Sequence, residues 1–339
     1  MTKKYNVAVV IGRFQPVHLA HKELLDFAFE QADKVIVIIG SANQPRTFKN
    51  PFTADERAQM IFSACPNRRS PNLVTVPNID TPYNDSAWVS RVQRIVYEHS
   101  NPTDKIVLVG HDKDQSTHYL NLFPQWGRIE FNNVINQLNA TDIRNLYFKD
   151  CVNLRYLTDV VPAGVFDFLT EFTQTTAYAG ILEDKNIVDK YKQQFAGLSY
   201  PPIFVTTDVV LIQSGHILMI ERKSSPGAGQ FALPGGFVNQ DEFLVDAAIR
   251  ELKEETKIKV PVSVLKGSIS KTMVFDYPGR SSRGRTITHA YLIELKDGPL
   301  EKVKGSDDAK RAMWVPLSEL DPSNIFEDHM SIIQMMAGV

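Results

Sequence analysis

Short runs of Val and Ile alternate with longer amphipathic stretches over the first half of the chain. The apolar runs predict buried strands at 7–11, 35–39, 73–76 and 106–109. Helical periodicity falls between and after them, at about 19–32, 53–65, 87–99, 141–149 and 163–172. Such alternation is typical of a parallel sheet with helices on both faces. We therefore predict an α/β fold for this half.

The pattern changes after a polar, charged stretch from about 180 to 200, which ends at Tyr200-Pro201-Pro202. A strand pair, one strong helix and three further strands are expected beyond it, at 205–212, 216–221, 241–257, 262–275, 286–295 and 312–315. These elements predict an α+β domain with a mixed sheet between helices. The expected organisation is a first domain, a linker and a second domain at 1–183, 184–202 and 203–339.

Glycines stand at the ends of the expected strands. Gly12, Gly40 and Gly110 each follow a strand, and ligands of parallel α/β sheets bind at the carboxyl ends of the strands. No Gly-x-Gly-x-x-Gly segment follows the first strand, which argues against an ordinary dinucleotide-binding dehydrogenase. Thr53 and Glu56 have the spacing of a capping box, which predicts a helix start.

One of these strand ends has the residues of a phosphate site. The stretch 12–21, Gly-Arg-Phe-Gln-Pro-Val-His-Leu-Ala-His, joins the first strand to the first helix, so backbone N–H groups and a positive helix end meet there. His18 and His21 share one face of the first helical turn, and Arg13 adds a permanent cation. We predict a polyphosphate ligand, ATP. A metal site or a structural histidine pair are the alternatives, and no third ligand lies nearby to favour the metal.

Composition and charge narrow the class of protein. The chain has 339 residues, 43% hydrophobic and 22% charged, which is enough for two domains with cores of their own. Its net charge of −2 indicates no general attraction to nucleic acid or to a membrane. Cys65 and Cys151 are too few for a disulfide framework, and the first residues hold no apolar leader or spanning segment. We expect a cytoplasmic protein and leave the oligomeric state open, with a homo-oligomer as one alternative.

The ordered motifs of the first domain resemble a known family. The segment 12–21 is similar to the His-x-Gly-His signature of nucleotidyltransferases, and in particular to archaeal-type nicotinamide mononucleotide (NMN) adenylyltransferases. The resemblance continues in Gly40-Ser41-Ala42, Arg46-Thr47, Asn50-Pro51-Phe52-Thr53, Glu56-Arg57 and Thr141-Asp142-Ile143-Arg144. It implies a Rossmann-like nucleotidyltransferase sheet. Ala20 replaces the usual glycine, which we expect to be tolerated if its φ is negative.

The resemblance implies adenylyl transfer from ATP to NMN, which yields NAD and pyrophosphate. On this pattern His18 contacts the α-phosphate, His21 the outer phosphates, and Arg144 with Thr141 the β- and γ-phosphates. Mg²⁺ would bridge the ATP phosphates. Catalysis would then rest on positioning and charge stabilisation, without a covalent nucleophile. The other substrate-binding residues expected here are Gly12, Arg13, Phe14 and Arg46, of which the two arginines would bind phosphate groups of the two substrates.

A segment after the third strand bears on the acceptor. Trp88 is either a core residue at a helix start or, on the family pattern, the ring on which nicotinamide stacks, with Asp80 and Asn84 as polar contacts. After the fourth strand, Gly110 and the four charged or polar residues that follow it, His111-Asp112-Lys113-Asp114, either line the nucleotide or form a solvated loop.

The second domain holds a more specific signal. Gly236 is followed by five residues and Glu242, then by seven residues and the run 250–258, Arg-Glu-Leu-Lys-Glu-Glu-Thr-Lys-Ile. On a helix Glu251, Glu254 and Glu255 share one face, where their charges repel each other. A divalent cation removes that repulsion, and carboxylate oxygens favour Mg²⁺ or, as a substitute, Mn²⁺. A solvated acidic helix is the alternative.

This spacing resembles the Nudix box, a signature of hydrolases of nucleoside diphosphates linked to another group. The resemblance implies hydrolysis of a pyrophosphate by a metal-activated water, with the three glutamates as metal ligands and catalytic residues. The family has glycine where this chain has Lys257, and we expect a different helix end there.

The segment 280–285 and the acidic loop 305–309 resemble those of ADP-ribose-type Nudix domains, so ADP-ribose is the expected substrate. The substrate-binding residues expected in this domain are Arg222, Gly236, Arg283 and Asp307. Asp307 or Asp308 is either the general base or part of a solvated loop.

Two classes of function follow from these resemblances. The first is a bifunctional enzyme of NAD metabolism that makes NAD and hydrolyses ADP-ribose to AMP and ribose 5-phosphate. The second is an adenylyltransferase whose Nudix domain senses ADP-ribose without hydrolysis, although the intact glutamates argue against a dead site. A narrower alternative changes the acceptor, for example to nicotinate mononucleotide. No basic helix-turn-helix follows, so a DNA-binding regulator is not expected.

Overall fold

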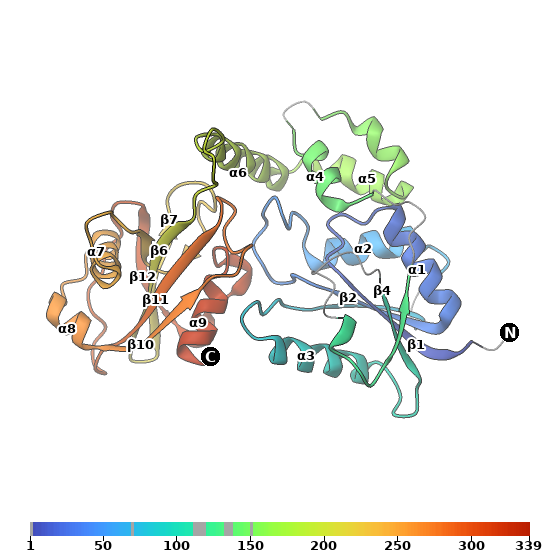
Figure 1. Ribbon diagram of the computed structural model, residues 1–339, viewed down its shortest axis with the longest axis horizontal. Coiled ribbons are helices and arrows are strands. Elements are labelled where there is room, and N and C mark those ends of the chain that lie inside the picture. Colours follow the sequence, from blue (N-terminus) through green and yellow to red (C-terminus); the bar gives the residue numbers. More distant parts are fainter. Residues whose placement is uncertain (1–2, 69–70, 111–119, 132–137, 150–151) are drawn as a thin grey trace. The chain divides into compact units, whose positions relative to one another are not determined.

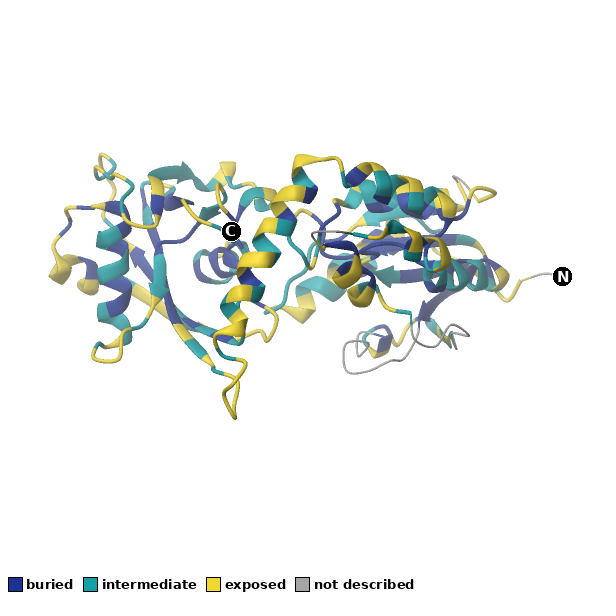
Figure 2. Ribbon diagram, turned by 90° about the horizontal axis from the view of Figure 1, so that it is seen from above, coloured by how far each residue is buried: buried dark blue, intermediate teal, exposed yellow. Residues whose placement is uncertain are grey.

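A computed structural model describes residues 3–68, 71–110, 120–131, 138–149 and 152–339. The chain divides into two compact units, Met1–Leu182 and Glu183–Val339, and each unit has a sheet of its own (Figure 1). In both units the buried residues lie along the strands and on the inward faces of the helices (Figure 2).

The first unit contains a parallel sheet with the strand order β3-β2-β1-β4-β5. Its strands are β1 (Tyr5–Gly12), β2 (Ala32–Ile39), β3 (Leu73–Pro77), β4 (Ile106–Gly110) and β5 (Gly127–Glu130). The four expected strands are confirmed. The short edge strand β5 was not expected, because its sequence Gly-Arg-Ile-Glu has no apolar run. With β1 at the centre, the loops after β1, β2, β3 and β4 meet at one edge of the sheet.

Helices cover both faces of this sheet, as expected. They are α1 (Leu19–Gln31), α2 (Ala54–Ala64), α3 (Asp85–Glu98), α4 (Ala140–Tyr147) and α5 (Ala163–Phe172), with a 3-10 helix η2 at Leu154–Asp159. Helices α1, α2, α4 and α5 pack on one face with strand residues such as Val10 and Val37, whereas α3 packs on the other with Val9 and Ile38. Figure 1 shows α3 on the opposite side of the sheet from α1 and α2.

The expected linker is partly helical. Helix α6 runs over Thr176–Gln193, and the polar composition of this stretch hid its amphipathic pattern. Tyr178 and Ile181 are buried with the first unit, and Val188 is buried within the second. An ion pair between Lys185 and Asp189, one helical turn apart, adds to the helix. Irregular backbone connects Gln193 to the next strand.

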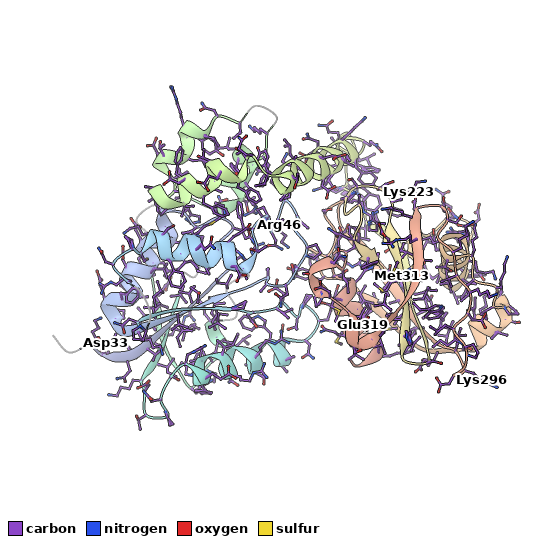
Figure 3. All side chains as sticks on the ribbon, turned by 180° about the vertical axis from the view of Figure 1, so that it is seen from behind. Asp33, Arg46, Lys223, Lys296, Met313 and Glu319 are labelled. Carbon is purple, nitrogen blue, oxygen red and sulfur yellow. The ribbon has the colours of Figure 1, made fainter. Side chains whose placement is uncertain are left out.

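The second unit is built on a mixed sheet with the strand order β10-β11-β6-β7-β12. Its strands are β6 (Phe204–Gln213), β7 (His216–Arg222), β8 (Phe231–Ala232), β9 (Gly235–Phe237), β10 (Ile269–Phe275), β11 (Thr286–Glu294) and β12 (Ala309–Pro316). Strand β11 runs parallel to β6, and β9 pairs with the start of β6 in antiparallel orientation. Lys223, just beyond β7, and Lys296, beyond β11, lie at opposite ends of this sheet (Figure 3).

Helices lie on both sides of this sheet. They are α7 (Leu244–Thr256), α8 (Val262–Gly267) and α9 (His329–Ala337), with 3-10 helices η3 (Leu317–Glu319) and η4 (Pro322–Asn324). Figure 1 shows α7 and α9 on opposite faces. The strand expected at 262–275 begins only at Ile269, because Pro261 starts a helix in which Leu265 is buried and Val262 and Val264 are exposed.

The end of α7 corrects the expectation for Lys257. The helix ends as a glycine would end it, because Lys257 itself adopts the left-handed conformation with φ 51° and donates its N–H to Lys253 O at 3.1 Å. Ala20, the other departure from the family pattern, lies inside α1 and has no positive φ, so it meets the condition set for tolerance.

Replacing Lys257 by Gly is expected to raise the free energy of unfolding of the second unit by about 1 kcal/mol, because a left-handed conformation strains a residue with a Cβ. Chemical denaturation of the full chain measures the change. Lys259, two residues on and also exposed, has no positive φ, so Lys259→Gly should be neutral or destabilising. Equal effects of the two substitutions would contradict this explanation.

Candidate functional sites

The first candidate site lies where the strands of the parallel sheet end. Phe14, directly after β1, has a φ of 53° and is buried, and its ring lies 4.8 Å from the ring of His21 between centroids. A Cβ on Gly12 would stand 3.1 Å from the Phe14 ring. The turn therefore favours a small residue at position 12. The same turn leads the chain from β1 into α1.

His18 and His21 are brought together as predicted. Their rings stack with centroids 3.7 Å apart and planes at 22°, and the side chain of His18 is buried. The backbone N–H of His18, the N-cap of α1, donates to His21 Nδ1 at 3.3 Å. Because Nδ1 accepts this hydrogen bond, the single proton of the neutral His21 ring is on Nε2. His21 is therefore oriented to present an N–H donor from Nε2.

Arg144 reaches the same turn from α4, far along the chain. Its Nη1 donates to Gln15 O at 2.6 Å and its Nη2 donates to Thr141 Oγ1 at 3.1 Å. Burial lowers the pKa of Arg144 to about 10, and the charge of Arg13 contributes in the same direction. Arg144 therefore lies beside Thr141 and against the turn that precedes α1, as expected.

Lys49 joins this group of cations, although it was not among the residues expected to bind substrate. Burial lowers the pKa of Lys49, and the charges of Arg13 and Arg144 act in the same direction. The charge of Arg13 thus lowers the pKa of both Lys49 and Arg144, and an anion bound among these three cations would relieve the repulsion. The position of Lys49 directly before Asn50-Pro51-Phe52-Thr53 was the only available signal.

Arg57 connects the loops that carry the site. Its side chain is 1% exposed, and its guanidinium donates to Arg13 O at 2.8 Å, Gly40 O at 2.6 Å and Ser41 O at 3.1 Å. Its Nε also donates to Thr53 O at 3.1 Å. Burial lowers its pKa to about 10. Arg57 therefore fixes the loops after β1 and β2 relative to α2, a role that sequence spacing alone did not indicate.

Replacing Arg57 by Met is expected to lower the free energy of unfolding of the first unit by about 3 kcal/mol, because buried carbonyl groups lose their donor. Chemical denaturation measures this loss. Arg94→Met is the matched control, since the Arg94 side chain is 69% exposed and forms only a surface pair with Glu98. A loss no larger than that of the control would show that the hydrogen bonds of Arg57 contribute little.

The residues expected to contact the acceptor have defined partners. Asp80 accepts the Ser41 N–H at 3.0 Å and the Ser41 hydroxyl at 2.5 Å, which connects the loops after β2 and β3. Asn84 caps α3 by accepting the Ala87 N–H at 3.0 Å. Trp88 is partly buried and packs with the α3-side core, 6.0 Å from Phe123 between ring centroids. These contacts give Trp88 and Asn84 structural roles, and their substrate contacts stay predictions.

Arg46 lies on the loop between β2 and α2, at the end of the unit opposite Asp33 (Figure 3). It forms a bidentate pair with Glu56, with distances of 2.6 and 2.7 Å, and also donates to Pro51 O at 2.7 Å. Glu56 and Thr53 form the predicted capping box of α2. A phosphate bound by Arg46 would therefore contact a guanidinium that is already paired with Glu56. Phosphate binding by Arg46 stays a prediction.

Gly110 ends β4, and a Cβ there would stand 2.8 Å from Leu120 Cδ2, so a larger residue would require the Leu120 side chain to shift. The residues set beside it in the sequence, His111, Asp112, Lys113 and Asp114, lie outside the described residues.

The second candidate site lies at the start of β6, where β9 and α7 meet. A Cβ on Gly236 would stand 2.5 Å from Glu251 Oε1, and one on Gly235 would stand 2.1 Å from Thr207 O. Glu255 is buried and accepts the Gly235 N–H at 3.0 Å. Gly235 is therefore constrained by the backbone of β6, and Gly236 by the Glu251 carboxylate that lies over it.

Arg250 holds the acidic side chains of α7. Its Nη1 contacts Glu251 at 2.8 Å and Glu254 at 3.1 Å, and its Nη2 contacts Glu242 at 2.6 Å. The hydrogen bonds from Arg250 and Asn239 lower the pKa of Glu242 to about 2. Glu242, conspicuous in the sequence spacing, thus orients Arg250. No pattern in the sequence indicated this function of Arg250.

The three glutamates fit a divalent cation by donor type. Within the described ranges, no three or more His, Cys, Asp or Glu side chains stand at metal-ligand spacing. The reason is that Glu251 and Glu254 turn to Arg250, while Glu255 turns to Gly235 N. Burial raises the pKa of Glu255 to about 8, and the charges of Glu251, Asp208 and Asp308 act in the same direction. A cation would relieve this repulsion once the carboxylates turn from Arg250.

Without metal, the free energy of unfolding of the second unit is expected to fall as the pH rises from about 4.5 to about 8. In this window folded Glu255 retains a proton that the unfolded chain has released, because burial raises its pKa from 4.5 to about 8. The slope for one such group is at most about 1.4 kcal/mol per pH unit. Denaturation in a chelator across this range measures it. Glu255→Gln should remove this slope, and an unchanged slope would contradict the assignment.

The residues expected to bind substrate in this unit include two arginines that lie against aromatic rings, and an aspartate whose charge acts on Glu251. Arg222 lies over the ring of Phe326, 4.0 Å from its centroid, and Arg283 lies 5.2 Å from the centroid of Phe237. Burial lowers the pKa of Arg222, and the charge of Arg283 contributes. Asp307 has a φ of 57°, and its charge helps to raise the pKa of Glu251, which burial raises most. Cations and carboxylates therefore stand close together at this end of the sheet.

Two family models match the chain, one for each unit. The cytidylyltransferase-like model matches residues 9–144, and the NUDIX domain model matches residues 202–336. Throughout the described part of the chain, each helix is too short or too polar to span a bilayer.

Similar proteins have names that correspond to the two units. A nicotinamide/nicotinic acid mononucleotide adenylyltransferase of Acinetobacter baylyi is 35% identical over 191 residues, which are 56% of this chain and 96% of that protein. An ADP-ribose pyrophosphatase of Methanocaldococcus jannaschii is 38% identical over 130 residues, 38% of this chain and 70% of that protein.

One solved structure is similar over both units. It is a bifunctional NMN adenylyltransferase/ADP ribose pyrophosphatase from Francisella tularensis, complexed with AMP and a Mn ion. It is 34% identical, has a TM-score of 0.92, and the match covers 98% of this chain and 99% of that one. The chain therefore belongs to the family of bifunctional enzymes that join an NMN adenylyltransferase to a Nudix ADP-ribose pyrophosphatase.

Proposed function

We propose that the first unit transfers the adenylyl group of ATP to NMN. The observation that carries this proposal is the meeting of Arg144 with the turn before the stacked His18 and His21, through its hydrogen bond to Gln15 O. An oxygen of the NMN phosphate attacks the α-phosphorus, the bond to the bridging oxygen breaks, and pyrophosphate leaves. NAD is the product.

The side chains of this unit would bind and orient phosphates. We propose that His18 and the Nε2–H of His21 donate to the triphosphate, while Arg13, Lys49 and Arg144 balance its charge. The repulsion between these cations supports this assignment, because binding of the negatively charged triphosphate would relieve it. Mg²⁺ bound to the phosphates would supply further charge neutralisation.

The second unit would hydrolyse ADP-ribose. We propose that Glu251, Glu254 and Glu255 hold Mg²⁺, for which Mn²⁺ can substitute, and that Arg222 and Arg283 bind the substrate. The bound cation would activate water. The water oxygen attacks one phosphorus of the pyrophosphate, the bridging bond breaks, and AMP and ribose 5-phosphate are released. The carboxylates crowded around Gly235 and Gly236 support this proposal.

Two assays on the full chain test both reactions. The first supplies ATP, Mg²⁺ and either NMN or nicotinate mononucleotide, and measures pyrophosphate and the dinucleotide formed. We expect turnover with NMN, and a higher kcat/KM for nicotinate mononucleotide would reverse the assigned preference. The second supplies ADP-ribose and Mg²⁺ and measures AMP. Binding of ADP-ribose without AMP release would favour the alternative, a sensor domain.

A further inference from the structure

The segment 233–236, Leu-Pro-Gly-Gly, carries the backbone over which the glutamates of α7 lie. Its middle residues are anchored within the site: Val209 N–H donates to Pro234 O at 2.9 Å, and Gly235 N–H donates to Glu255 at 3.0 Å. Its first residue is anchored from a different place. Leu233 N–H donates to Nδ1 of His329, at 2.9 Å.

His329 is the first residue of α9, 96 positions along the chain from Leu233. It is buried, with 7% of its surface exposed. Burial lowers the pKa of His329 to about 3, and nearby arginines contribute, so the ring is neutral and Nδ1 can accept a hydrogen bond. The remaining proton is then on Nε2, which lies 3.9 Å from Asp208 Oδ1.

Buried polar side chains fix the position of this ring. Arg280 forms a bidentate pair with Asp328, the residue before His329, with both distances 3.0 Å. Asp208 accepts the Thr288 hydroxyl at 2.6 Å and lies 3.7 Å from Arg280. A Cβ on Gly235 would stand 2.7 Å from Asp208 Oδ1, so the same carboxylate also borders the segment. These polar contacts fix the orientation of the imidazole ring, which apolar packing alone would not do.

We propose that His329 is a positioning residue for pyrophosphate hydrolysis, acting through its hydrogen bond to Leu233 N–H to hold the segment 233–236 under the glutamates of α7. This inference rests on the proposed hydrolysis of ADP-ribose by the second unit. Some side chains do not bind a metal themselves but orient the residues that do. Replacing such a side chain typically lowers metal affinity or activity by about 10–100-fold. Through His329, helix α9 therefore helps to orient the backbone of the proposed hydrolytic site.

Two substitutions separate the hydrogen bond from the packing. His329→Asn keeps an acceptor close to the place of Nδ1, whereas His329→Leu fills similar space without one. We expect kcat for ADP-ribose and affinity for Mn²⁺, measured by electron paramagnetic resonance without substrate, to fall about 10-fold or more in the Leu variant. The Asn variant should stay within about three-fold of the original chain, with KM for ADP-ribose little changed in both. NAD synthesis by the same samples reports intact first units.

Equal losses in the Asn and Leu variants would overturn the proposal, because the acceptor would then be irrelevant. A second measurement needs no variant and covers the case in which the Leu variant does not fold. In the unaltered chain, the ¹⁵N chemical shift of His329 Nδ1 should be that of an acceptor nitrogen, and a protonated Nδ1 would overturn the proposal. Failure of the unaltered chain to release AMP would instead refute the proposed hydrolysis.

Discussion

Replacing Glu254 by Gln is expected to lower the rate of AMP release from ADP-ribose on the order of 10³-fold and to leave NAD synthesis unchanged. Glutamine keeps the size of the side chain and removes its charge. Glu254 lies on the same face of α7 as Glu251 and contacts the same nitrogen of Arg250, so its loss takes one negative ligand from the proposed cation. The charge-neutral variant should bind Mn²⁺ more weakly.

Glu319→Gln is the matched control for this prediction. Glu319 is exposed at the end of the 3-10 helix η3 after β12, at the end of the sheet opposite Lys223 (Figure 3). AMP release and NAD formation should be measured on the same samples over a series of Mg²⁺ concentrations. Loss of both activities in the Glu254 variant would show that the two reactions are not independent. Unchanged hydrolysis at low Mg²⁺ would remove Glu254 from the set of metal ligands.

Sequence periodicity predicted the elements whose own residues determine them. The strands of the first unit are continuous Val- and Ile-rich runs, and the helix starting after Thr53 has its capping box in the sequence. The expectation was wrong at 262–267, where Pro261 starts a helix, and at Lys257, which accepts a left-handed conformation that propensity disfavours. Helix α6 was missed because its buried positions are few among charged ones.

Motif spacing selected residues that are expected to contact ligands, but not the residues that hold those side chains and loops in place. Arg57 donates to four carbonyl groups on the loops after β1 and β2, and such backbone acceptors leave no pattern in the sequence. Arg250 and His329 act through partners that the fold brings together, and for His329 the partner is a backbone N–H distant in the chain. Positioning residues therefore require the structure, because their partners are defined by tertiary packing.

Replacing Arg144 by Met is expected to lower the rate of NAD synthesis by about 10²–10³-fold, because a preorganised donor to the phosphates is removed. ADP-ribose hydrolysis by the same chain should not change. Arg144→Lys restores the charge but cannot reproduce the planar fork that contacts Gln15 O and Thr141 Oγ1, so its rate should lie between those of Met and Arg.

The initial rate of pyrophosphate release with NMN and ATP measures this effect, and Arg94→Met again serves as the exposed control. Because Arg144 also fixes Gln15, a displaced turn is a second source of loss. Thr141→Val keeps the charge of Arg144 and its bond to Gln15 O, but removes the Oγ1 acceptor that orients the guanidinium and the predicted contact of Thr141 with the phosphates. A small effect of Thr141→Val beside a large effect of Arg144→Lys would assign the loss to the contacts of Arg144 itself. Comparable, large effects of both would assign it to Thr141, as the residue that orients Arg144 or contacts the phosphates.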